Sequence, residues 1–326
     1  MGTVRRLTEA RLRTILSRQD PPAFGRDYAP SIRAVREEAP DKSRFAMVWS
    51  ALVEREISTL SRPEKWVLYI VLYCPWLFDI QEQRMLPYLQ APHPLTGHPL
   101  AVGMKLPSFR GTLAIAEELG ALELHPVLRI ASTTDPTVMA AVPFPWIGDF
   151  LLFLLDDLGP YCINLTIKAT DAEFDVPTVG IRPNTDMKRA VRHAEVRHRA
   201  EQILYEDVDI PTIRVAADKV NTTVLANLEH IYGWQRRVHP FDEAQRLEIV
   251  DALRAGVLAG VSALEVIHNL MAEFSHALYD LKIVMYQAIW KREIRIDLYQ
   301  YFFIERPLIA EHRDVLDEFS HWFKRS

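Results

Sequence analysis

The sequence predicts an α/β protein whose carboxyl-terminal part is mostly helical, and three observations support this class. An apolar run over 147–155 and an alternating segment over 161–168 flank an Asp-Asp-Leu-Gly-Pro turn, a pattern typical of a β-hairpin. Apolar residues recur at helical spacing over 45–73, and long helical patterns fill the chain after about residue 218. The chain has 326 residues, 49% of them hydrophobic, which suffices for two domains that each bury a core.

The amino-terminal segment 1–45 is polar, rich in arginine and interrupted by prolines, so we expect an extended arm around a short helix. Its basic amphipathic pattern superficially resembles an organellar transit peptide, but we favour a solvated helical arm. The segment 45–73 predicts two helices, and 78–86 predicts an extended segment. A loop rich in proline and glycine follows over 90–107. The next helix covers 112–119, and Gly120 closes it.

The second half of the chain begins with a basic helix over 185–205 and a strand over 212–216. Three helices and a strand-like segment come next, over 242–258, 262–274, 276–291 and 293–299. Three helices followed by a β segment are the element order of a winged-helix module. We therefore predict an Arg-rich arm over 1–45, an α/β domain over 46–217 and a winged-helix-like domain over 218–326.

Composition and charge exclude several classes of protein function and of metal site. The chain carries 38 Lys and Arg against 43 Asp and Glu, a net charge of -5, whereas a protein that binds DNA tightly by itself usually has a basic excess. Any DNA binding therefore needs local positive charge or a partner. Cys74 and Cys162 are isolated, which excludes zinc sites of the usual cysteine spacing and fits a reducing cytoplasm. No stretch reaches the ~18–20 apolar residues of a membrane helix, so we expect no membrane contact.

The predicted hairpin carries the residues with the clearest chemical potential. In its second strand Asn164, Thr166 and Lys168 alternate with aliphatic residues and share one face, and Asp149 on the first strand can lie close to that face. Magnesium-dependent phosphodiester hydrolysis needs a carboxylate that holds a hard cation and an ammonium group that positions water and balances phosphate charge. The same two residues also fit a cross-strand ion pair at the sheet margin, and local spacing leaves both interpretations open.

Glu64 is the third candidate, because it opens a predicted helix after Ser61-Arg62-Pro63. Nucleases that hydrolyse phosphodiesters with magnesium, carboxylates and a lysine commonly take one carboxylate from a helix packed beside the sheet. Ser-x-x-Glu before an apolar run is also a capping box, in which the glutamate reaches back to the backbone N–H of Ser61. A carboxylate engaged in a cap is poorly placed to bind metal, so structure can separate the two interpretations.

Several stretches carry a family resemblance, in chain order: SRPEKW around Glu64, FDIQEQRMLPY, IAEELG followed by His-Pro, GDFLLF with Asp149, and Thr166-Ile167-Lys168. Together they resemble TnsA, the endonuclease subunit of Tn7-like heteromeric transposases. The resemblance covers roughly residues 45–234. It implies a restriction-endonuclease-like fold of the PD-(D/E)xK type for the α/β domain, with Glu64, Asp149 and Lys168 as the catalytic residues.

The resemblance also implies a metal, an activity and partners. Glu64, Asp149 and Thr166 would hold Mg²⁺ or Mn²⁺; Thr166 stands where the wider pattern has an acid or amide, so a strand carbonyl would complete the coordination. The implied activity is cleavage of the non-transferred strand at the 5′ transposon ends during cut-and-paste transposition. The implied partners are transposon-end DNA, a TnsB-like DDE transposase and a TnsC-like AAA+ regulator that docks on the carboxyl-terminal domain. The implied location is the bacterial cytoplasm, with nucleoid association during activity.

Other features are less specific. The basic helix carries a cluster that can follow a phosphate backbone or form a solvated face: Lys188, Arg189, Arg192, Arg197 and Arg199. Glu195 is an additional acidic candidate near the site, and the five-residue spacing of His193 and His198 argues against a helical zinc pair. The alternative function is a non-catalytic DNA- or protein-binding assembly subunit that keeps a nuclease-like fold.

Overall fold

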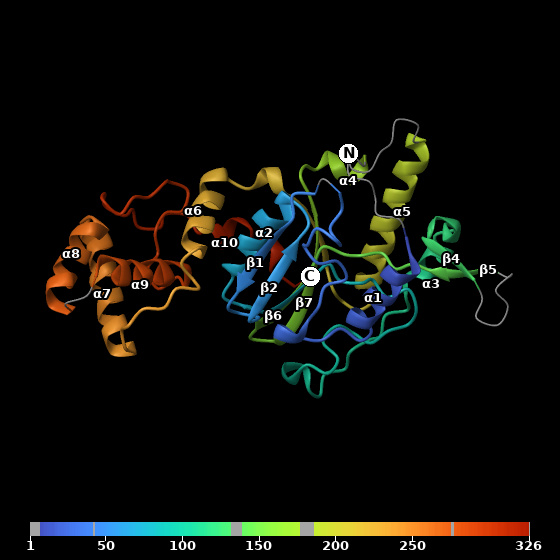
Figure 1. Ribbon diagram of the computed structural model, residues 1–326, viewed down its shortest axis with the longest axis horizontal. Coiled ribbons are helices and arrows are strands. Elements are labelled where there is room, and N and C mark those ends of the chain that lie inside the picture. Colours follow the sequence, from blue (N-terminus) through green and yellow to red (C-terminus); the bar gives the residue numbers. More distant parts are fainter. Residues whose placement is uncertain (1–6, 42, 132–138, 177–185, 275–276, 326) are drawn as a thin grey trace. The chain divides into compact units, whose positions relative to one another are not determined.

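The computed structural model describes residues 7–41, 43–131, 139–176, 186–274 and 277–325 (Figure 1). It divides into two compact units, the first formed by 1–65, 76–218 and 322–326 and the second by 66–75 and 219–321. Strands and helices are mixed in the described residues, so the α/β class is confirmed. The restriction-endonuclease-like and winged-helix-like assignments and the domain limits stay predictions.

The first unit is built on a mixed sheet with strand order β3-β6-β7-β8 in the described residues. The strands are β3 Leu77–Glu82, β6 Phe150–Asp156, β7 Gly159–Lys168 and β8 Thr212–Ala216. The predicted hairpin is confirmed as the antiparallel pair β6–β7, and β8 has the predicted limits. Helix α5, Met187–Glu206, connects β7 to β8, which pair in parallel, as a helical crossover allows. This helix confirms the predicted basic helix.

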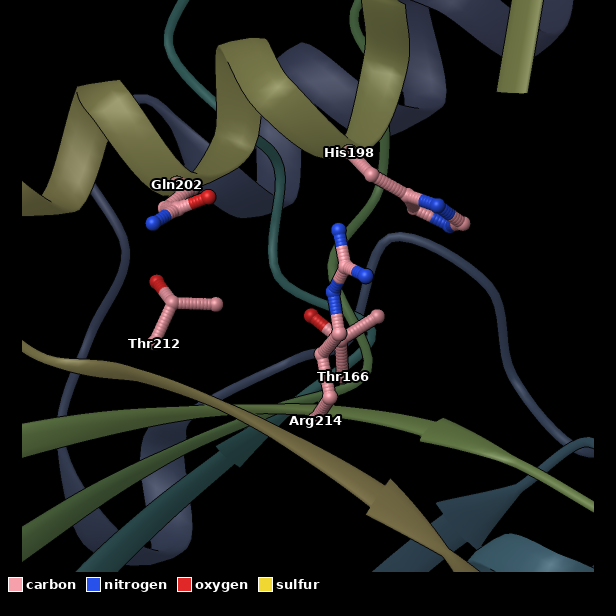
Figure 2. Close-up of a pocket in the computed structure, with 5 residues that line it drawn as sticks. All are labelled: Thr166, His198, Gln202, Thr212 and Arg214. Carbon is pink, nitrogen blue, oxygen red and sulfur yellow. The ribbon is translucent and has the colours of Figure 1, made fainter. Parts of the chain in front are cut away.

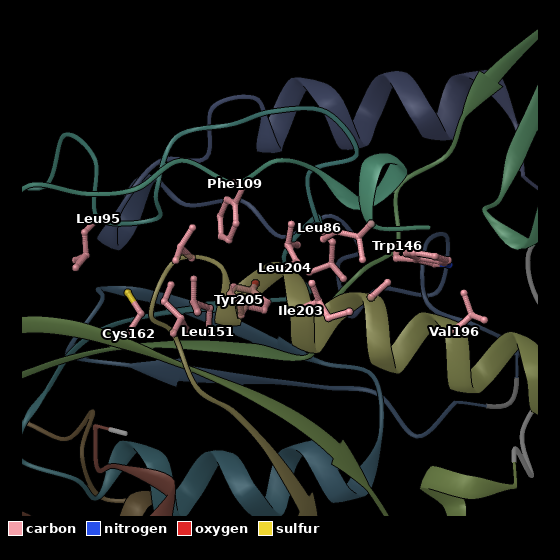
Figure 3. Packing of buried hydrophobic residues seen from close by; sticks show 14 of the residues in the cluster. Leu86, Leu95, Phe109, Trp146, Leu151, Cys162, Val196, Ile203, Leu204 and Tyr205 are labelled. Carbon is pink, nitrogen blue, oxygen red and sulfur yellow. The ribbon is translucent and has the colours of Figure 1, made fainter. Parts of the chain in front are cut away.

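A large apolar core packs between α5 and the sheet (Figure 3). Helix α5 contributes Ile203, Leu204 and Tyr205, while Leu151 and Cys162 come from the β6–β7 hairpin. Helix α3, Thr112–Glu118, confirms the predicted short helix, and Gly120 follows it with a positive φ of 60°. Other short helices of the unit are η1 Gly25–Asp27, η2 Pro99–Ala101, η3 Leu122–Leu124, α4 Ala172–Asp175 and η4 Ala217–Lys219.

The prediction of two helices over 45–73 is half wrong. Its first part forms a hairpin of β1 Ala46–Ser50 and β2 Arg55–Thr59, and only its second part is a helix, α2 Arg62–Leu72. The hairpin is fixed by a buried ion pair in which Arg55 Nη1 lies 2.8 Å from Glu82 Oε1, an oxygen that also accepts from the backbone N–H of Ser58 at 2.9 Å. This long-range contact stabilises the hairpin over the helix that the spacing of apolar residues predicts, because a buried carboxylate must be paired.

The amino-terminal arm is also packed rather than solvated. Helix α1, Glu9–Gln19, confirms the short helix, but its Leu12 and Ile15 are buried in a cluster with Met85 and Phe144. The Gln19 side chain accepts from the backbone N–H of Met85 at 3.0 Å and donates to the carbonyl of Ala29. The expectation of a solvated arm is therefore wrong. A second hairpin, β4 Val127–Ala131 with β5 Met139–Pro143, was not predicted.

The second unit is helical in its described residues. It includes most of α2 together with α6 Thr222–Tyr232, α7 Glu243–Ala259, α8 Ala263–Phe274, α9 Leu278–Trp290 and α10 Val315–Glu318, and the chain passes back to the first unit within η5 Ser320–Trp322. The helices predicted over 242–291 are thus confirmed. The predicted strand over 293–299 is wrong: Ile296 forms only an isolated bridge with Ala310, and the Asp297 side chain accepts from the backbone N–H of Tyr299. None of the described helices is long and apolar enough to cross a membrane.

Candidate active site

The structure brings Glu64, Asp149 and Lys168 to the wall of one cavity of about 620 Å³ in the first unit. Glu64 comes from the first turn of α2, Asp149 directly precedes β6, and Lys168 ends β7. Asp149 and Lys168 are half-buried, while Glu64 is 7% exposed. The three side chains therefore reach the same solvent-connected space from different elements.

Glu64 caps its helix and lines the cavity at the same time. Its Oε1 accepts from the Ser61 hydroxyl at 2.7 Å, and its Oε2 accepts from the backbone N–H of Leu60 at 2.8 Å and from Gln83 Nε2 at 3.0 Å. The Ser61 Oγ in turn accepts from the Glu64 N–H at 3.3 Å. The cap differs from the expected box, because the backbone N–H that Glu64 reaches belongs to Leu60. Capping and lining the cavity are therefore not exclusive alternatives.

The surroundings of Glu64 disfavour its negative charge. Burial, and then the neighbouring charge of Asp149, raise the pKa of Glu64 to about 7, although Ser61, Leu60 and Lys168 act in the opposite direction. When two carboxylates lie close together, the negative charge of one disfavours ionisation of the other and raises its pKa. A cation in this cavity would relieve that repulsion.

Asp149 is held in place by the sheet. Its Oδ2 accepts from the backbone N–H of Ile167 at 2.7 Å, and its carbonyl accepts from the N–H of Gln83 at 2.8 Å. Within the described residues, Oδ1 of Asp149 has no hydrogen-bond donor, and Asp149 and Lys168 form no ion pair. One carboxylate oxygen and one ammonium group thus remain available to a ligand.

Thr166 does not line this cavity. It is buried and lines a separate pocket of about 400 Å³ together with His198, Gln202, Thr212 and Arg214. The structure therefore does not bring the predicted metal ligand Thr166 to the space shared by Glu64 and Asp149.

Glu201 is a buried acidic residue that the sequence reasoning missed. It is fully buried on α5, and its Oε1 accepts from Asn164 Nδ2 at 3.2 Å. Its Oε2 lies 3.8 Å from Arg197 Nη2 and accepts no hydrogen bond from the described residues. Burial raises the pKa of Glu201; Arg197 opposes this shift, and Asp149 adds to it. The available signal was the apolar spacing of Val196, Ala200 and Leu204, beside which Glu201 lies on the helix.

The basic cluster of α5 divides in the structure. Lys188, Arg189, Arg192 and Arg199 are exposed, but Arg197 is half-buried and donates to the carbonyl of Ile147 at 2.6 Å. Glu195 has a side chain that is 55% exposed and lies 3.9 Å from Arg192, outside the cavity wall. The exposed members keep the charge that contact with a phosphate backbone requires.

The donor set fits a divalent cation with few protein ligands. Among the described residues no group of three or more His, Cys, Asp or Glu side chains could hold a metal ion. Mg²⁺ usually keeps several waters and binds through one or two carboxylates plus substrate phosphates. Glu64 and Asp149 would provide that number of protein carboxylates. Neither a scan against protein-family models nor a search of curated proteins finds a match to this chain.

Proposed function

We propose that this chain is a metal-dependent DNA endonuclease, acting as the TnsA-like subunit of a heteromeric transposase. The observation that carries the proposal is the cavity whose wall includes Glu64, Asp149 and Lys168, where Asp149 Oδ1 and the Lys168 ammonium group remain open to a ligand and the Glu64 carboxylate already accepts three hydrogen bonds. Two carboxylates with a lysine are the minimal set for phosphodiester hydrolysis that is assisted by a hard cation.

Each residue has a distinct role in this proposal. Glu64 and Asp149 would hold Mg²⁺ or Mn²⁺, an ion that lowers the pKa of water and stabilises charge on a phosphate. Lys168 would position the attacking water and balance the charge of the scissile phosphate. Ser61 and Gln83 would orient the Glu64 carboxylate, and the N–H of Ile167 would orient that of Asp149.

The resemblance to TnsA supplies the finer part of the proposal. Cleavage would fall on the non-transferred strand at the 5′ transposon ends, and a TnsB-like DDE transposase would cut the other strand. A TnsC-like AAA+ regulator would be the second protein partner. The net charge of -5 supports dependence on partners, because the whole chain has no excess of positive charge for binding DNA alone.

Strand-resolved cleavage tests this proposal. A duplex containing a mobile-element end, labelled separately on each strand, is incubated with the full chain and Mg²⁺ or Mn²⁺, with and without the neighbouring transposase proteins. We expect metal-dependent cleavage of the strand ending 5′ at the element. Cleavage confined to the opposite strand, or equal in EDTA, would contradict the proposal; cleavage without any partner would identify a stand-alone nuclease.

A second candidate function rests on the hydrogen bonding of Glu64. Because three donors already engage this carboxylate, the chain could serve as a non-catalytic DNA- or protein-binding assembly subunit. That function predicts assembly with the transposase proteins on end DNA and no cleavage by this subunit under any metal condition.

A further inference from the structure

The pocket that contains Thr166 is chemically distinct from the cavity of Glu64. Figure 2 shows Gln202 and His198 projecting from α5 over Thr166, Thr212 and Arg214 of the sheet. Its volume is about 400 Å³, and among the described residues that line it none is acidic. The lining combines polar groups with apolar surface, and Arg214 is its charged residue.

His198 is a buried polar residue in the wall of the pocket. It is 7% exposed, and in the part of the chain that the structure describes its Nδ1 has no hydrogen-bond partner. Burial, and then the charges of Arg197, Lys168 and Arg214, lower the pKa of His198 to about 3. The His198 ring is therefore neutral, and among the described lining residues Arg214 carries the charge, so the wall of the pocket is positive and favours an anion.

The available hydrogen-bond donors fit an oxyanion. Thr212 Oγ1 accepts from Asn164 Nδ2 at 3.3 Å, so its own hydroxyl hydrogen is free to point elsewhere. The Arg214 guanidinium lies 5.5 Å from the centre of the Phe174 ring and, within the described residues, has no carboxylate partner. Gln202 Nε2 donates one of its two N–H groups to Glu206 at 2.6 Å, so it contributes at most one further donor. The main donors are one guanidinium and two threonine hydroxyls.

We infer that this pocket binds a phosphate group, held by the Arg214 guanidinium and the hydroxyls of Thr166 and Thr212. Guanidinium groups match the planar edge of phosphate oxygens, and hydroxyls complete their hydrogen bonds. The absence of carboxylates from the lining disfavours a divalent cation at this position. Thr166 thus serves an anion rather than a metal.

The position of the pocket indicates the source of the phosphate. Thr166 and Lys168 lie two residues apart on β7, and Lys168 lines the cavity of Glu64 and Asp149. A DNA strand whose scissile phosphate occupies that cavity would bring a neighbouring backbone phosphate to the pocket. This assignment of the source rests on the proposed function, whereas the affinity for phosphate does not.

The site is tested by titrating the full chain with inorganic phosphate in EDTA. Amide chemical shifts measure the binding. We expect saturable binding that Arg214→Gln weakens at least about tenfold, equivalent to about 1.4 kcal/mol. Arg129→Gln is the matched control, because Arg129 is also an exposed arginine on a strand and does not line the pocket. Thr212→Val provides a second variant if Arg214→Gln fails to fold. Absence of saturable binding, or binding unchanged in both variants, would overturn the inference.

Binding to a DNA duplex in EDTA distinguishes the sources of the phosphate. If the pocket takes a backbone phosphate, Arg214→Gln makes the negative slope of log K against log salt less steep by about 0.9, and Arg129→Gln leaves it unchanged. An unchanged slope together with lost phosphate binding assigns the pocket to a free phosphate compound and overturns the DNA source. Failure of the proposed function is separate, because it would appear as absent cleavage while phosphate binding persists.

Discussion

At the scale of single residues, the electrostatic repulsion between the carboxylates of Glu64 and Asp149 is the most informative feature of the first unit. Glu64 is nearly buried and has accepted three hydrogen bonds, yet its pKa is raised to about 7 because burial and Asp149 outweigh those bonds. A cap that served only the helix would gain nothing from a second carboxylate nearby. The repulsion is therefore better explained by a shared ligand than by helix capping alone.

The repulsion predicts a measurable change in titration. Asp149→Asn removes a negative neighbour, so ionisation of Glu64 becomes easier and its pKa falls below about 7, while burial keeps it above the ordinary value. Carboxyl-carbon NMR of the metal-free protein measures this pKa. Asp157→Asn, an exposed residue in the turn of the same hairpin, is the control. An unchanged pKa in Asp149→Asn would show that the two carboxylates do not interact.

Glu201 predicts a pH dependence of stability. Its pKa is raised in the folded protein, so its protonated form is the stable one there, and stability is lost as pH rises from about 4.3, the ordinary carboxyl value, through the raised pKa. Glu201→Gln removes this loss. The free energy of unfolding of the variant should therefore gain on that of the wild type as the pH rises above about 4.3. Glu195→Gln, at an exposed position of the same helix, is the control, and a difference for Glu201→Gln that does not change with pH would contradict the assignment.

At the scale of elements, sequence patterns succeeded where local rules decide the structure. The β6–β7 hairpin follows from an apolar run and an alternating segment on either side of a turn, and the end of α3 follows from a glycine that adopts a positive φ of 60° at low cost. The β1–β2 hairpin could not be predicted in this way. Its conformation depends on Glu82, a residue distant in the sequence that pairs with Arg55 and Ser58. The spacing of apolar residues over 45–59 is a local pattern, so it cannot predict a contact with a residue far along the chain.

The dependence on Glu82 predicts an asymmetric cost of charge removal. Arg55→Ala leaves a fully buried carboxylate without its cation, so it should lower the free energy of unfolding by about 3–5 kcal/mol. Arg26→Ala breaks an exposed pair with Glu54 at 3.9 Å and should cost less than about 1 kcal/mol. Urea unfolding of the full chain measures both. Equal small losses would mean that the hairpin is held by apolar packing instead.

At the scale of the whole molecule, the candidate site combines residues that only the tertiary structure can join. Glu64, Asp149 and Lys168 could be selected because their residue types and positions permit hydrolysis, and the resemblance to TnsA favoured that interpretation over a helix cap or an ion pair. Arg214 could not, since a single exposed strand arginine has no distinctive spacing. The apolar positions beside Glu201 on α5 indicate its burial but no chemical role. Thr166 shares a face of β7 with Lys168, yet it lines a different pocket, because α5 and β8 surround Thr166 whereas residues 60–64 and Asp149 surround Lys168.

The acidic whole chain and its two basic regions fit a subunit that contacts DNA locally. The exposed cations of α5 and the pocket around Arg214 lie in the first unit, which also holds the cavity of Glu64. Contact between DNA and this unit alone would involve few phosphates, so its affinity would be weak and dependent on salt. Partner proteins would then supply the remaining affinity and the choice of sequence.

The most direct test of the central claim compares cleavage by two matched pairs of variants in a reconstituted reaction on end DNA. Asp149→Asn and Lys168→Ala should each reduce cleavage of the labelled strand at least about a hundredfold, the scale of a lost acid–base or electrostatic group. Asp157→Asn and Lys105→Ala, which change exposed residues outside the cavity wall, should cleave at the wild-type rate. Full cleavage by folded Asp149→Asn or Lys168→Ala would contradict the claim that this cavity performs the chemistry.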